Sequence, residues 1–164
     1  HVQATRMQGL PAFYGNPVSA YADRHLDLVG LGAMLAVSAR TNLNTLSAIR
    51  YKREFGAKNI FSIQTTNDES EGLDKKTAAD RFKGELMFSD GITFAKLNQY
   101  FRAGEKFAST TLTAEYDFEK FSTNNPNNIV LFAFDPKGKI HFVAKQQDFK
   151  PNKDWTIISA PIVD

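Results

Sequence analysis

The stretch from Leu26 to Gln64 constrains the fold most, because it combines two apolar segments with an amphipathic segment between them. Residues 33–37 are nearly all apolar, which is typical of a strand that is covered on both faces. Residues 38–42 turn polar and open a helix, and residues 59–64 form a second apolar segment. Strand, helix and strand in this order predict a βαβ unit of a parallel sheet.

The helix of this unit carries its own signals. Leu43, Leu46 and Ile49 recur at a spacing that lines one helical face, so we expect this face to be buried. Gly56 follows the last turn, at the position where a left-handed C-cap is expected.

Composition limits the class of protein. The chain has 164 residues with 42% hydrophobic content, enough for a core in one domain or two small ones. It has no cysteine, which excludes thiolate metal sites and thiol catalysis. No apolar run approaches the roughly 18 residues of a membrane span, and no signal peptide opens the sequence, so we expect no direct membrane insertion. The net charge of +2 is too balanced to favour nucleic acid.

The residues before this unit predict further alternation of helices and strands. We expect a helix over 1–8, a strand over 10–14, a turn over 15–17 and a helix over 18–25. A doubly wound fold that begins on a helix lacks its first strand and the Gly-rich phosphate loop that follows it. The sequence begins at His1 rather than Met, so we expect a cut or processed fragment.

A glycine pair in this region does not replace the missing loop. Gly30 and Gly32 precede a predicted strand, whereas a phosphate loop connects a strand to a helix. We therefore interpret them as a turn into the strand.

The second half has a different pattern. Residues 66–82 are rich in charged and small side chains and are predicted to be a linker. Residues 83–164 then predict a small α+β domain. Its expected strands are 84–88, 106–113, 129–134, 139–145 and 155–160, and its expected helices are 93–103 and 114–121. The clearest pair is the hairpin that turns at residues 135–138, because this turn contains both Pro and Gly.

No residues with a catalytic or metal-binding pattern stand out. The acidic cluster of Asp68, Glu69 and Glu71 lies in the predicted linker, where nothing would bury it and perturb a pKa. The three histidines are widely scattered and do not have metal-ligand spacing. Ser38 has no surrounding G-x-S-x-G motif.

The best candidate for a ligand site is the edge at the carboxyl ends of the predicted strands, where doubly wound sheets bind ligands. Gly15 and Asn16 follow one predicted strand, and Ser38 and Arg40 follow the next. These four residues are the predicted cofactor-binding residues. The alternative, that they form only structural turns, stays open.

Several segments are recognisable. GLPAFYGNP from Gly9, ADRHLDLVGLGAMLAVS from Ala22 and NTLSAIRYKREFGAKNIF from Asn44 resemble the later part of the TrkA-N (RCK) domain in bacterial sodium/proton antiporters of the monovalent cation:proton antiporter-1 type. The second half resembles the TrkA-C-like domain that follows. Its matching segments are GELMFSDGITFAKLNQYF, TTLTAEYDFEKF, LFAFDPKGKIHF and PNKDWTIIS.

The resemblance implies a truncated Rossmann-like domain over residues 1–65, without the first strand and Gly-rich loop, and a TrkA-C-like domain over 83–164. It implies a regulatory and non-enzymatic tail at the cytoplasmic face of the bacterial inner membrane. Its expected partners are the transmembrane antiporter domain of the same polypeptide and a second copy in a homodimer. Related domains sense nucleotides of the NAD, ATP or AMP type. Because the Gly-rich loop is absent, we expect weak or no dinucleotide binding by this fragment, and such a site only in the full-length parent.

Two other function classes remain as alternatives. One is a regulatory subunit of a potassium uptake or channel system, which shares the fold. The other is a small α/β enzyme, which would need a convergent acid, base or nucleophile at the strand ends, where only Asn16, Ser38 and Arg40 are found.

Overall fold

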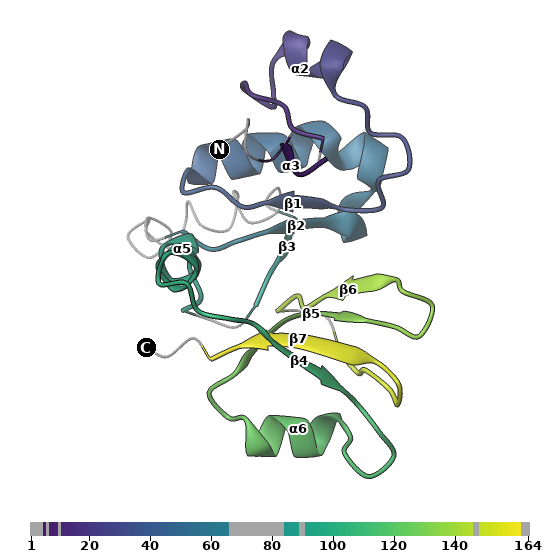
Figure 1. Cartoon of the computed structure of the whole chain (residues 1–164). Helices are drawn as coiled ribbons and strands as arrows, with labels where there is room; N and C mark the ends of the chain where they lie inside the picture. Colours follow the sequence, from purple (N-terminus) through teal and green to yellow (C-terminus); the bar gives the residue numbers. More distant parts are fainter. Residues whose placement is uncertain are drawn as a thin grey trace, which may run out of the picture.

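The computed structural model describes residues 5, 7–9, 11–65, 84–88, 91–145 and 148–161. Within them, a small parallel sheet lies above an antiparallel sheet, with helices on the outer sides (Figure 1). The elements are α2 (Ala20–His25), β1 (Met34–Ala36), α3 (Thr41–Phe55), η1 (Ala57–Asn59), β2 (Ile60–Ser62), β3 (Glu85–Leu86), α5 (Phe94–Arg102), β4 (Ala108–Thr111), α6 (Phe118–Asn124), β5 (Ile129–Phe134), β6 (Ile140–Phe142) and β7 (Thr156–Ala160).

The predicted βαβ unit is confirmed. β1 and β2 pair in parallel, with Leu35 opposite Phe61, and α3 connects them. β3 pairs in parallel on the other side of β2, which gives the order β1-β2-β3. The second sheet is antiparallel, with the order β4-β7-β5-β6. The chain is therefore a mixed α/β protein.

The two sheets are joined directly after β3. Met87 forms an antiparallel bridge with Ala144 just beyond β6. The amide of Phe88 donates to the carbonyl of Val143 over 3.1 Å, and the amide of Lys145 donates to the carbonyl of Leu86 over 2.8 Å. The chain thus passes from the parallel sheet onto the edge of the antiparallel sheet within a few residues.

The larger buried cluster crosses this junction. It contains residues of the parallel sheet and its loops, of α5, and of the antiparallel sheet: Phe61, Ile63, Met87, Phe88, Ile92, Tyr100, Leu131, Ala144 and Ala160. A smaller cluster lies under α6, where Phe121 packs against Leu112, Ala133 and Ile157. The two sheets therefore share one core, and α6 covers the far side of the antiparallel sheet (Figure 1).

Two local predictions place a glycine at a turn, and both glycines have a positive φ. Gly56 ends α3 with φ of +75°, but its ψ of 152° lies outside the left-handed helical region, so the predicted left-handed C-cap is wrong. Gly138 closes the β5–β6 turn with φ of +80°, as predicted. In the same turn, Asp135 Oδ1 accepts hydrogen bonds from the amides of Lys137 and Lys139, both at 2.9 Å.

The predicted buried face of α3 is wrong. Leu46 and Ile49 are 52% and 46% exposed. The buried side chains are Asn44, Ser47, Ala48 and Tyr51, which also follow helical spacing. Small side chains on this face let the helix lie close to the short sheet.

Two strand predictions also need correction. β1 is an edge strand, and Leu35 is 38% exposed, so the strand is not covered on both faces. Residues 11–14 are irregular rather than a strand. Pro11 has no amide hydrogen to donate, and the ring of Phe13 packs on Tyr21 of α2 with 5.8 Å between ring centroids.

The remaining predictions differ at the element ends. The helix expected over 114–121 begins later, at Phe118, because the Asp117 side chain caps it by accepting from the amide of Lys120. Most of the expected helix over 1–8 and all of the predicted linker, 66–82, lie outside the described residues. In the described part of the chain, no helix is long and apolar enough to span a bilayer.

Gly84 is placed so that a side chain would collide with β2. Its φ is +74°, and a Cβ would lie 2.6 Å from the carbonyl oxygen of Ile60. Gly104 has a similar φ of +73° with nothing within 4 Å of a Cβ. We expect Gly84→Ala to lower the free energy of unfolding by about 3 kcal/mol and Gly104→Ala by only about 1 kcal/mol. Urea titration followed by circular dichroism measures both, and equal losses would contradict the close contact.

Candidate functional site

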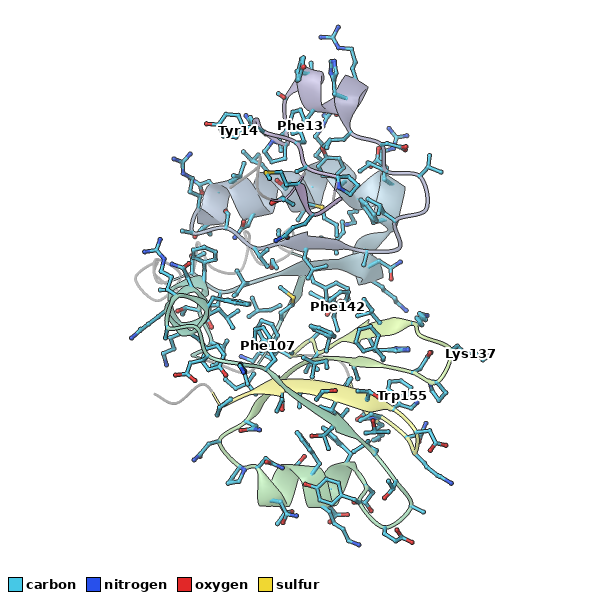
Figure 2. All side chains as sticks on the ribbon, viewed as in Figure 1. Phe13, Tyr14, Phe107, Lys137, Phe142 and Trp155 are labelled. Atoms are coloured by element: carbon cyan, nitrogen blue, oxygen red, sulfur yellow. The ribbon has the colours of Figure 1, made fainter. Side chains whose placement is uncertain are left out.

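The carboxyl end of β1 opens onto a hollow of about 540 Å³. Its walls are formed by the loop before α2 and by the first turn of α3: Phe13, Tyr14, Gly15, Asn16, Pro17, Arg40 and Leu43. Phe13 and Tyr14 lie on that loop, beside α2 (Figure 2). Three of the four predicted site residues, Gly15, Asn16 and Arg40, thus line one hollow.

The loop is held on α3 by Tyr51. The Tyr51 hydroxyl donates a 2.6 Å hydrogen bond to the carbonyl of Pro17. This side chain is 6% exposed, and its burial raises the pKa of the phenol above its ordinary value. Since the phenol stays protonated at neutral pH, it remains a donor and fixes the loop wall of the hollow.

Asn16 stabilises this loop through two hydrogen bonds. Its Oδ1 accepts from the amide of Val18 over 3.1 Å, and its carbonyl accepts from the Ser19 hydroxyl over 2.7 Å. Ser19 in turn caps α2 by accepting from the amide of Ala22. Asn16 therefore shapes the hollow by ordering the start of α2.

Ser38 does not line the hollow. Its hydroxyl donates to Asn44 Oδ1 over 2.7 Å and accepts from the amide of Arg40 over 3.2 Å. Asn44 Oδ1 also accepts from the Ser38 amide, and Asn44 Nδ2 donates to the Ser38 carbonyl over 2.9 Å. These hydrogen bonds of Ser38 therefore stabilise the turn that positions Arg40.

Arg40 supplies the charge of the hollow. It is the N-cap residue of α3, and its side chain makes no cap hydrogen bond. The 15-residue helix α3 begins directly after it, so the positive end of the helix dipole lies next to this residue. One cation beside the rings of Phe13 and Tyr14 can attract a small anion, and the residues that line this hollow include no acid, general base pair or thiol.

The carboxyl end of β2 meets the same helix. The hydroxyls of Thr41 and Thr65 share a hydrogen bond that ties the first turn of α3 to the residues after β2. Sequence reasoning missed this contact, as well as Asn44 and the ring walls. The one signal for Asn44 in the sequence was an asparagine in the first turns of the predicted helix, six residues after Ser38.

No metal site accompanies the hollow. Across the described residues, no group of three or more His, Asp or Glu side chains could hold a metal ion.

Asn44 tests how much the Arg40 turn depends on a buried amide. The side chain is 5% exposed, and Asn44→Ala would leave the amide and carbonyl of Ser38 without these partners. We expect a loss of about 2–3 kcal/mol in the free energy of unfolding. Asn42→Ala, at an exposed position of the same helix, should change it by less than about 0.5 kcal/mol. Urea denaturation distinguishes the two, and a near-neutral Asn44→Ala would show that the turn is held by other contacts.

No family model matches the chain, and no curated protein matches its sequence.

Proposed function

We propose that this chain is a regulatory module of a bacterial membrane antiporter that exchanges Na⁺ or K⁺ for H⁺. The resemblance of its segments to the cytosolic tails of such antiporters supports this proposal. The resembling segments from Ala22 and Asn44 include β1 and most of α3 and β2, the three elements of the parallel βαβ unit. In this interpretation the unit is the later portion of a Rossmann-like domain, and residues 83–164 are the TrkA-C-like domain.

The observation that carries the proposal is the hollow at the carboxyl end of β1. Ligands of doubly wound sheets bind at this edge, and here it brings together Gly15, Asn16 and Arg40. The single cation and the ring walls suit recognition of an anionic effector better than a chemical reaction. The fragment alone offers no Gly-rich loop, so dinucleotide affinity would be weak and a full nucleotide site would need the parent protein.

Regulation requires that a signal at the hollow reach the transmembrane carrier. The shared core offers a physical route, because Phe61 of β2 packs on Phe142 of β6 with 5.1 Å between ring centroids. A ligand that prefers one arrangement of the two sheets would shift the population toward it. The carrier would respond if it also distinguished the two arrangements.

Two apolar side chains on the outer face of α3 support the proposal of a homodimer. Leu46 and Ile49 lie on this face and are about half exposed. Buried against the same face of a second copy, they would form an isologous contact.

A truncation tests the regulatory role in the parent protein at the inner membrane. The reading frame upstream of His1 should encode about a dozen apolar segments of the length that a membrane span requires. Proton-coupled Na⁺ and K⁺ transport in inside-out vesicles should change its pH or ion dependence when this chain is deleted. Arg40→Ala should reproduce part of that change, and Arg53→Ala, an exposed cation elsewhere on α3, should not. Transport that is indifferent to the deletion would refute the proposal, and a reading frame without spans would favour a potassium-uptake subunit.

The dimer has its own test. We expect a concentration-dependent dimer in sedimentation velocity at micromolar chain, and Leu46→Glu should weaken it at least tenfold by burying a charge in an apolar contact. Lys137→Gln makes the same change in net charge at the exposed tip of the β5–β6 hairpin, away from α3, and should leave the dimer intact. A wild-type chain that stays monomeric, or equal effects of both variants, would contradict this interface.

A further inference from the structure

A second cavity, of about 620 Å³, runs along the edge strand β6 and is lined by residues of both sheets. Residues that precede β1 and β2 form one wall, among them Ala33, Lys58 and Asn59, and β6 with the loop before β7 forms the other. It therefore opens at the amino ends of the parallel strands, whereas the hollow with Arg40 lies at their carboxyl end. We call it the amino-end groove. Its volume is in the range of small-molecule sites.

Aromatic rings line the amino-end groove on both faces of β6, because Phe142 points into the core between the sheets and His141 lies on the opposite face, beside the cluster under α6. Phe61 and Phe142 pack at 5.1 Å between centroids, and the rings of His141 and Trp155 lie 4.4 Å apart. Phe149 is the fifth ring, and it packs on Phe118 of α6 with 5.5 Å between ring centroids. Figure 2 shows Phe142 between the two sheets and Trp155 at the start of β7.

The backbone around these rings is held in place. The carbonyl of Trp155 accepts from the amide of Leu112 over 2.8 Å, which ties the loop before β7 to β4. His141 Nε2 lies 3.1 Å from Asp135 Oδ2 in the β5–β6 turn. This contact and the amide of Lys139 lower the pKa of the Asp135 carboxyl, so it stays ionised at neutral pH and orients the imidazole. The walls are therefore preformed, which reduces the entropic cost of binding.

The charge at the mouth of the groove is positive. Lys58, Lys139 and Lys150 line it, and Asp148 is the acidic residue among its lining. Asp148 pairs with Lys150. Within the described ranges, the ammonium groups of Lys58 and Lys139 form no ion pair, so two cations from opposite walls remain for a ligand.

Two apolar side chains are left exposed at the same mouth. Leu35 of β1 is 38% exposed and Ile140 of β6 is 44% exposed. An occupant with an apolar body would cover both while its charged group met the lysines. Aromatic surface is the natural complement of such ring-lined walls, since offset and edge-to-face ring contacts are favourable.

We propose that the amino-end groove is a binding site for a small aromatic anion. The ring system covers Phe142 and the exposed Leu35 and Ile140 at the edge of β6, and the carboxylate, sulfonate or phosphate group meets Lys58 and Lys139. The site uses none of the residues of the Arg40 hollow, so it stands independently of the antiporter proposal.

The single tryptophan of the chain makes this proposal directly measurable, because Trp155 lines the groove. The probe is 8-anilinonaphthalene-1-sulfonate, an aromatic anion that accepts energy from tryptophan. Its neutral counterpart, N-phenyl-1-naphthylamine, has the same rings without the sulfonate. We expect saturable binding of the anion with quenching of Trp155 emission, and weaker binding of the neutral probe.

Charge reversal at the mouth separates the proposed site from general surface attraction. Lys58→Glu and Lys139→Glu should each weaken binding of the anion about fivefold, and leave the neutral probe within twofold. Lys137→Glu makes the same charge change at the tip of the same hairpin, outside the groove lining (Figure 2), and should leave both probes within twofold. Thermal melting of each variant checks the fold, and the corresponding Lys→Gln variants replace any that melts early.

Three results would overturn the proposal. The first is the absence of saturable quenching. The second is an equal loss of anion binding in Lys137→Glu, which would indicate attraction to the whole surface. The third is an equal loss of both probes in Lys58→Glu and Lys139→Glu, which would show that the sulfonate does not meet these lysines.

Discussion

The structure depends most on the junction where the chain leaves β3 and joins the edge of the antiparallel sheet. β1 and β2 have three residues each and β3 has two, and strands this short do not make an independently stable sheet. Two contacts with the antiparallel sheet stabilise the parallel sheet. These are the bridge between Met87 and Ala144 and the packing of Phe61 on Phe142. The antiparallel sheet, with six residues in β5 and five in β7, supplies most of the regular structure beneath it.

Local signals explain what the sequence could predict. Gly56 ends α3 and Gly138 closes the hairpin, because each takes a positive φ that other residues avoid. The buried face of α3 was mispredicted, since Leu46 and Ile49 have helical spacing and hydrophobicity but face outward. The face of a helix that is buried depends on how close the helix lies to the sheet, and tertiary packing determines this distance. The hydrophobic pattern of one segment does not contain that information.

The two candidate sites also differ in how far the sequence could predict them. Arg40 reaches the hollow because it follows β1, as the strand-end rule predicts. Gly15 and Asn16 follow no strand, and they reach it because Tyr51 of α3 holds their loop through the Pro17 carbonyl. Ser38 is not among the residues that line the hollow, and its hydroxyl is bonded to Asn44, which lies six residues away inside the helix. The residues that line the amino-end groove lie between positions 32 and 155, so no local spacing in the sequence predicts the groove. Only the stacking of one sheet on the other creates it.

The two sites lie at opposite ends of the same strand. Lys58 and Asn59 precede β2 at the amino-end groove, and Thr65 follows it where the hydroxyl of Thr41 ties it to α3 beside Arg40. Seven residues of extended chain span roughly 20 Å. Phe61 faces the groove and is packed in the shared core, so β2 can move only if that core rearranges with it. A close-packed core changes between discrete arrangements rather than yielding gradually. An occupant of the groove would therefore affect the Arg40 hollow in an all-or-none way or not at all, and the sign of that coupling would be the same when measured from either end.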